Sequence, residues 1–190
     1  MEARRAGDVT ERKRRFAALL RNSAVLRFGL SLVARVLAPR PPVGAVGALF
    51  DGDGRVLLVE HVFRTDFPWG LPGGWVRRGE DPAHAVAREI REELGLTVEV
   101  GPLLLTEPVG RTSRSTHPPH LGLAYACSLV GGTASLSAEV VSIEWTHPHE
   151  IRHELAPLQH KAVLLAADAL ARAKRDATRQ PRNSANQALE

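Results

Sequence analysis

Three glutamates lie close together in the segment 88–94, which reads REIREEL. An α-helix turns about 100° per residue, so Glu89, Glu92 and Glu93 would share an arc of about 100°. Like charges at this spacing repel each other, and a hard divalent cation would turn that repulsion into a binding site. Carboxylate oxygens suit Mg²⁺, which commonly binds one or two carboxylates together with substrate phosphates. Glutamates are also good helix formers on a solvated face, so these three alone do not establish a metal site.

A glycine pair precedes this acidic segment. Gly73 and Gly74 belong to the run 71–80, which reads LPGGWVRRGE. Paired glycines let the backbone approach a phosphate closely and can direct N–H groups at it. Directly before an acidic helix, the pair completes an arrangement that could bind a phosphate and a metal ion together.

The acidic segment lies on the clearest helix that the sequence predicts, residues 82–94. Asp81 can cap its N-terminus, Pro82 suits the first helical position, and Gly95 suits the C-terminal stop. Ala85 is expected on the acidic side of the helix. An apolar flank is expected to pack on a sheet, and its members are Val86, Ala87, Ile90 and Leu94.

Strands are predicted on both sides of this helix. Residues 43–60 read as a β-hairpin around the turn sequence DGDG, and the glycine- and proline-rich residues 65–74 read as a loop. Further strands are predicted at 75–76, 97–105, 121–130 and 140–145, and a final helix at 157–173. This order predicts an α/β fold with a mixed sheet covered by helices.

The acidic helix and the glycine run together resemble the signature of a known family. Residues 74–96 match the Nudix box, G-x5-E-x7-R-E-U-x-E-E-x-G-U with U aliphatic, at every specified position. The resemblance implies a Nudix-type α/β/α sandwich over residues 41–172. It also implies hydrolysis of a nucleoside diphosphate linked to another group, with Mg²⁺ or Mn²⁺ as the cofactor.

The resemblance further implies roles for individual residues. Glu89 and Glu93 would be the main metal ligands, and Glu92 would share a second metal ion or orient a water. Arg88 would hold Glu80 in place through a charge-assisted pair.

The general base stays open between Glu92 and Glu139, with Glu89 as a third possibility. Glu139 precedes Trp145 by six residues. Some family members carry an acid at a similar spacing, where it approaches the metals or acts as the base. An ordinary solvated loop glutamate fits the same position.

Substrate contacts are less sharply indicated. Gly73 and Gly74 would shape the loop beside the metal ions, and Arg64 and Arg77 could hold phosphates. Trp75 could stack on a base, although burial in the fold is the commoner use of such aromatics. The remaining candidates are Phe67, Trp69, Arg78 and the loop 110–120, which includes Arg111, Arg114, His117 and His120.

The net charge of +4 conceals an asymmetry along the chain. Residues 1–40 carry ten Lys or Arg against three Asp or Glu, whereas residues 41–170 carry ten against sixteen. The first 40 residues read as a basic, amphipathic, helical extension that ends at a proline-rich link. Such an extension could pack on the domain, form a homodimer, lie on an anionic membrane or bind RNA. Residues 173–190 read as a polar tail.

Composition narrows the class of protein. Cys127 is the only cysteine, which excludes an internal disulfide and any multi-cysteine metal centre. Arginines interrupt the most apolar stretch, residues 16–38, so neither a membrane span nor a signal peptide is expected, and we expect a cytoplasmic protein.

Three functional hypotheses remain. The first is a pyrophosphohydrolase of a small nucleotide, such as a nucleotide sugar or a nucleoside triphosphate. The second is the same reaction on RNA 5′ ends, with the basic extension binding the RNA. The third is a non-catalytic, nucleotide-sensing domain, which the intact box disfavours.

Overall fold

The computed structural model describes residues 2–38, 40–110 and 118–179. The chain divides into two compact units, Met1–Arg40 and Pro41–Glu190. The candidate active-site residues belong to the second unit.

The first unit consists of two helices, α1 (Glu2–Asn22) and α2 (Ala24–Leu37). Ser23 separates them, because its backbone is extended and its side chain accepts a hydrogen bond from the Leu26 amide. The Arg27 guanidinium donates to the Leu20 carbonyl at 3.2 Å and also to the Arg21 carbonyl, which satisfies the end of α1. The predicted helical extension is therefore two helices joined at a capping residue.

The described helices can be compared with the length and apolar composition that a membrane span needs. Among the described residues, no single helix is both long and apolar enough to cross a bilayer. Residues 11–22 and 24–37 reach that composition only as a pair, across a bend of 99°.

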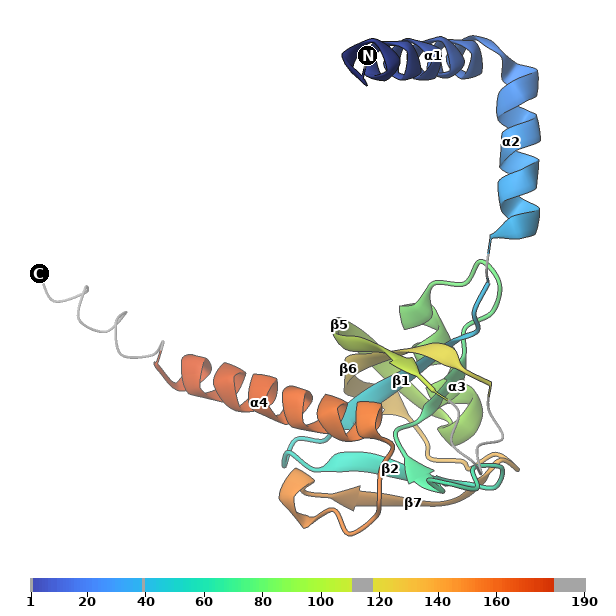
Figure 1. Cartoon of the computed structure of the whole chain (residues 1–190). Helices are drawn as coiled ribbons and strands as arrows, with labels where there is room; N and C mark the ends of the chain where they lie inside the picture. The colour runs from blue at the N-terminus through green and yellow to red at the C-terminus, as the bar shows by residue number, and fades with distance from the viewer. Residues whose placement is uncertain (1, 39, 111–117, 180–190) are drawn as a thin grey trace, which may run out of the picture. The chain divides into compact units, whose positions relative to one another are not determined.

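The second unit is built on a seven-stranded mixed sheet (Figure 1). Its strands are β1 (Val43–Phe50), β2 (Val56–His61), β3 (Trp69–Gly70), β4 (Gly73–Trp75), β5 (Leu96–Val109), β6 (His120–Gly132) and β7 (Val140–Thr146). The order is β3-β2-β1-β6-β5, with β4 paired to β1 and β7 paired to β2. β1 and β6 run parallel, and the other pairs are antiparallel.

Helices cover both faces of this sheet, α3 (Pro82–Leu94) on one and α4 (Pro157–Arg179) on the other (Figure 1). The alternation along β2 shows why, because Leu57 and Val59 pack in the cluster that contains α3. Val56 and Leu58 pack in the cluster that contains α4. Each such fully buried side chain contributes about 1.5–3 kcal/mol. The prediction of an α/β/α sandwich with a mixed sheet is confirmed.

The predicted hairpin of residues 43–60 is confirmed only at its turn. The Asp51 carboxylate accepts hydrogen bonds from the Asp53 and Arg55 amides, and Phe50 pairs with Val56. Beyond that pair β1 and β2 separate. On the edges where they no longer pair with each other, β4 pairs with β1 and β3 pairs with β2. The prediction that residues 65–74 are all loop is therefore wrong.

The other bounds differ from prediction at the ends of the elements. β5 extends to Val109 because register shifts near Val100 and Leu103 let pairing with β6 continue past Gly101 and Pro102. The short strand predicted at 75–76 is β4, which begins at Gly73. The last helix continues beyond residue 173 to Arg179.

Helix α3 has the predicted bounds. The Asp81 carboxylate accepts from the Ala83 amide at 2.8 Å, and Gly95 ends the helix in a left-handed conformation, with φ of 69°. Val86, Ile90 and Leu94 are buried as expected. Ala87 is only partly buried and Ala85 is fully buried, which corrects the predicted flank. The buried face is thus rotated toward the acidic side.

Candidate active site

Gly73 lies where only glycine fits. Its φ is 141°, and a Cβ there would lie 2.3 Å from the Ala45 carbonyl oxygen and 2.7 Å from the Val46 Cα. The close approach follows from the pairing of β4 with β1, in which Val46 is the partner of Gly73. With β4 held there, the Gly73 amide donates a hydrogen bond to Glu93 Oε2 at 3.1 Å.

Gly74 leaves room for the carboxylate of Glu89. A Cβ at this position would lie 2.7 Å from Glu89 Cδ and 2.8 and 3.0 Å from its two carboxylate oxygens. Because Gly74 has no side chain, the carboxylate of Glu89 on α3 can reach β4.

Glu93 is the most buried of the three acids, with 6% of its surface exposed. Burial, helped by the charges of Glu89 and Glu139, raises the pKa of its carboxyl to about 7. The Gly73 amide and the positive charge of Arg64 act in the opposite direction. Glu139 lies on an exposed turn before β7, and its negative charge contributes to the raised pKa of Glu93.

Arg88 ties the acidic face together. Its Nε and Nη2 donate to the two Glu80 carboxylate oxygens at 2.7 and 3.0 Å, and its Nη1 donates to Glu89 at 2.7 Å and to Glu92 at 3.1 Å. Nη2 also donates to the Trp75 carbonyl at 3.2 Å. The hydrogen bonds that the guanidinium donates to Glu80, Glu89 and Glu92 raise its pKa. One side chain therefore joins the glycine segment to the carboxylates of α3.

Glu80 is the principal partner of this arginine. The Arg88 side chain and the Arg77 amide, which donates at 2.8 Å, lower the pKa of the Glu80 carboxyl to about 2. The contact between Arg88 and Glu80 is the one that the sequence motif suggested.

The other predicted substrate residues lie in two groups. Arg77 Nη2 is 3.5 Å from Glu92 Oε2, and the Trp75 ring meets the His120 ring edge-on with centroids 4.9 Å apart. Arg64 lies over Gly70, where a Cβ would be 2.5 Å from its Nη1. Burial lowers the pKa of Arg64 to about 10, and the charge of Glu93 partly offsets that effect. Trp75 lies on β4, Arg77 follows β4, and Arg64 follows β2, so the three residues belong to different segments of the chain.

Trp69, another predicted substrate residue, contacts a different part of this unit. Trp69 stacks on His153 at a centroid distance of 4.0 Å, which is a packing role. Arg111, Arg114 and His117 lie outside the described residues.

Three residues near the glycine segment or the acids were not foreseen from the sequence, and His61 is the one that contacts an acid of α3. His61, buried at the end of β2, has its Nδ1 3.5 Å from Glu93 Oε1. Both carboxylate oxygens of Asp66 are buried and make no hydrogen bond within the part of the chain that is described. Gln159 of α4 accepts a hydrogen bond from the Leu71 amide at 2.8 Å and so holds the glycine segment from the other face. A lone histidine, aspartate or glutamine carries no spacing signal that sequence reasoning could use.

The fit of a divalent cation follows from the chemistry of these side chains. Within the described ranges, no three His, Cys, Asp or Glu side chains stand in the arrangement of a metal centre. Glu89 and Glu92 instead contact Arg88, and Glu93 contacts Gly73. The candidate donors Glu89, Glu92 and Glu93 are all carboxylates on one helix, so the set suits a hard cation.

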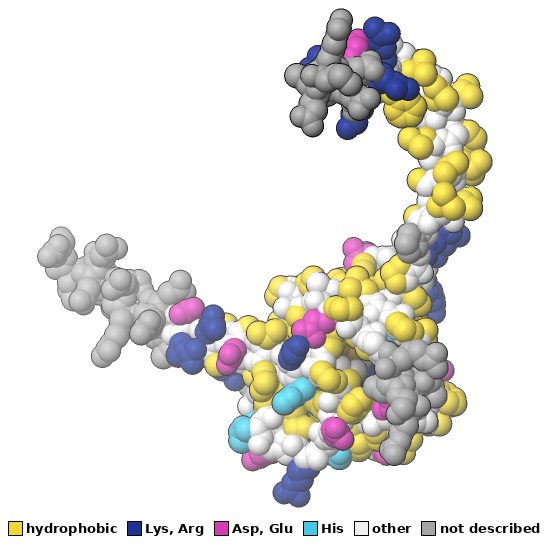
Figure 2. All heavy atoms as spheres, viewed as in Figure 1, with side chains coloured by type: hydrophobic (Ala, Val, Ile, Leu, Met, Phe, Trp, Pro, Cys, Tyr) yellow, Lys and Arg dark blue, Asp and Glu magenta, His cyan; other side chains and the backbone are white. Residues whose placement is uncertain are grey.

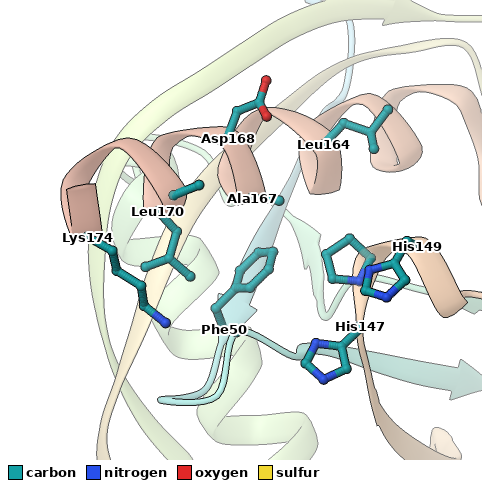
Figure 3. Close-up of a pocket in the computed structure, with 11 residues that line it drawn as sticks. Phe50, His147, His149, Leu164, Ala167, Asp168, Leu170 and Lys174 are labelled. Atoms are coloured by element: carbon teal, nitrogen blue, oxygen red, sulfur yellow. The ribbon is translucent and has the colours of Figure 1, made fainter.

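A surface hollow elsewhere on the unit is not the reaction site. Figure 3 shows that it lies between the end of β1 and α4, where Phe50, Leu164, Leu170 and Lys174 line it. None of the acidic residues of α3 borders this hollow.

Comparison with known proteins adds to this geometry. Residues 39–166 match the family model described as the NUDIX domain. The chain is 32% identical over 134 residues to a MutT-like protein of Streptomyces ambofaciens, covering 69% of this chain and 82% of that protein. It is 30% identical over 119 residues to the CTP pyrophosphohydrolase of Escherichia coli strain K12, covering 60% and 84% respectively. A solved MutT Nudix hydrolase from Burkholderia pseudomallei superposes with a TM-score of 0.58 at 26% identity, covering 67% of this chain and 98% of that chain.

Proposed function

Because this chain belongs to the Nudix family and is a hydrolase acting on diphosphate bonds, we propose that its substrate is a small nucleotide in which a pyrophosphate joins a nucleoside to another group. The nucleotide sugars and the nucleoside triphosphates are the two classes that fit. The observation that carries the proposal is the position of Glu89 and Glu93 of α3 beside the Gly73–Gly74 backbone, with Glu92 joined to Glu89 through Arg88. We propose the cytoplasm as the compartment.

The proposed cofactor is Mg²⁺ or Mn²⁺, with Glu89 and Glu93 as its main ligands and Glu92 as a third. A divalent ion held by these carboxylates supplies positive charge to the diphosphate and lowers the pKa of a bound water. The preference for these ions rests on the oxygen-only donor set.

Arg88 is proposed as a positioning residue. Its paired contacts with Glu80 fix the guanidinium, and its third nitrogen then holds Glu89 and Glu92 at set places on α3. Gly73 fixes Glu93 in the same way through its amide. The acids thus reach the substrate already oriented, which reduces the reorganisation needed for reaction.

The proton acceptor in this proposal is Glu92 or Glu139. Both are exposed, whereas Glu89 accepts a hydrogen bond from Arg88 at 2.7 Å and Glu93 is buried. Turnover of Glu92→Gln and Glu139→Gln across a pH series separates the two, because loss of the base removes the acidic limb of the profile.

The phosphate and base contacts are proposed around this centre. We propose that Arg77, whose Nη2 is 3.5 Å from Glu92, and Arg64, whose pKa is affected by the charge of Glu93, bind phosphate oxygens. Trp75, 37% exposed and in edge contact with His120, offers a ring face for a nucleobase.

The experiment is a panel of substrates assayed with Mg²⁺ and with Mn²⁺. Nucleotide sugars, nucleoside triphosphates and 5′-triphosphate RNA are incubated with the full chain, and release of mononucleotide or phosphate is measured. We expect metal-dependent release from one of the first two classes, with turnover lowered by about 100-fold in a Glu93→Gln variant. Release from RNA alone, with an affinity that falls steeply with salt, would instead support the second hypothesis. Metal-independent release, or none from any substrate, would contradict both.

A further inference from the structure

Helix α2 presents an unusually wide apolar surface. None of its residues is buried. Its eight large apolar side chains are all exposed, namely Val25, Leu26, Phe28, Leu30, Leu32, Val33, Val36 and Leu37. At about 100° per residue they span an arc of about 200° around the helix. The remaining strip holds Arg27, Ser31 and Arg35, and Figure 2 shows the hydrophobic side chains crowded along α2.

Positive charge accompanies this apolar arc. Residues 12–50 contain eight Lys or Arg and no Asp or Glu, the cations being at positions 12, 13, 14, 15, 21, 27, 35 and 40. In Figure 2 the described basic side chains of α1 lie beside the bend that leads into α2. Glu11, just before this run, pairs with Arg15 at 3.1 Å, and residues 1–40 as a whole carry ten Lys or Arg against three Asp or Glu. The first unit therefore joins a wide hydrophobic surface to a segment with a large excess of positive charge.

These two features together favour one kind of partner. A helix that packs on a protein core needs an apolar stripe only somewhat wider than about 100°, and a seam with one partner helix is narrower still. A second copy of this unit would bring together two segments that each carry ten Lys or Arg against three Asp or Glu. RNA would engage the cations but would leave the apolar arc in water. An anionic lipid surface buries the arc in the acyl boundary and neutralises the cations with its headgroups.

We propose that α1 and α2 form an interfacial anchor, in which the apolar arc of α2 enters the surface of an anionic membrane while the cations of residues 12–21 bind lipid headgroups. Arg27 contributes to this geometry, because its hydrogen bonds to the Leu20 and Arg21 carbonyls hold the polar strip of α2 against the end of α1. The apolar arc is on the other side of the helix. The proposal does not depend on the substrate of the hydrolase.

The test is flotation of the full chain with vesicles of phosphatidylcholine alone or mixed with phosphatidylglycerol. We expect flotation with the mixed vesicles only, weakened by salt because the cations are screened. Replacing Arg12, Lys13, Arg14 and Arg15 by glutamine should lower the partition coefficient by about fivefold for each cation removed.

The contribution of the apolar arc of α2 to membrane binding is tested by combining Phe28→Ser with Val36→Ser. These two side chains are 71% and 74% exposed. The matched control is Val130→Ser with Val141→Ser, two exposed valines of the sheet unit. We expect the first variant to lose flotation and the control to keep it, with hydrolysis unchanged in both.

Three outcomes would overturn the proposal. The first is failure of the chain to float with the anionic vesicles. The second is a dimer, formed without lipid, that the Phe28→Ser and Val36→Ser changes abolish, which would make a second copy the partner. The third is tight RNA binding that is independent of those two changes, with no binding to vesicles, which would make RNA the partner.

Discussion

Replacing Gly73 by alanine tests how the glycine segment is held against the sheet. The new Cβ would lie 2.3 Å from the Ala45 carbonyl oxygen and 2.7 Å from the Val46 Cα, so backbone must move. A residue with a side chain at φ of 141° also carries conformational strain, about 1–3 kcal/mol. Overpacking adds a similar amount, so we expect a loss of about 3 kcal/mol in the free energy of unfolding. For a chain of this length that lowers Tm by about 10 °C.

Gly74→Ala makes a different collision. The atoms in its way are the carboxylate of Glu89, the far end of a flexible side chain, and the φ of Gly74 lies outside the left-handed region. The carboxylate can swing aside, so we expect a Tm within about 2 °C of wild type. Turnover should fall by about 100-fold, because Glu89 is displaced from its place beside the glycine pair.

The assay compares thermal unfolding with metal-dependent turnover per folded molecule. Gly131→Ala is the matched control, because this strand glycine has open space where a Cβ would go. The reasoning is refuted if the Tm of Gly73→Ala equals that of the Gly131→Ala control. It is also refuted if Gly74→Ala melts as low as Gly73→Ala while its folded fraction turns over normally.

Three further predictions concern single groups. Arg88→Lys cannot make the paired contacts to Glu80 while reaching Glu89, so turnover should fall by about 10–100-fold in steady-state assays. The pKa of Glu80 is lowered from 4.5 to about 2, so its stabilising effect is full above 4.5 and disappears toward pH 2. The Tm difference between wild type and Glu80→Gln should therefore close over that range. Burial raises the pKa of Cys127 to about 12, so iodoacetamide at pH 8, an ordinary labelling condition, should modify it only after unfolding.

Local signals in the sequence were enough to define α3. Asp81 and Gly95 act on the backbone within a few residues of themselves, and both occupy the predicted capping positions. The contact between Arg88 and Glu80 was also foreseeable, because the motif brings the two residues together by their spacing around the start of the helix.

Long-range pairing explains what the sequence did not reveal. Residues 69–70 and 73–75 contain glycines and are flanked by Pro68 and Pro72, which favours a loop. They nevertheless form strands because β1 and β2 separate and leave edges to pair with. The same pairing decides the burial of Glu93. A helical wheel places this residue among solvated acids, whereas the approach of Gly73 on β4 encloses it.

The measurement that tests the central claim most directly is binding of Mn²⁺, followed by electron paramagnetic resonance, in the wild-type chain and in Glu89→Gln and Glu93→Gln. We predict that each change weakens Mn²⁺ binding and lowers nucleotide turnover by about 100-fold, with Gly131→Ala unchanged as the control. Undiminished Mn²⁺ binding and turnover in Glu93→Gln, in a protein that still folds, would contradict the assignment of the α3 carboxylates as the metal site.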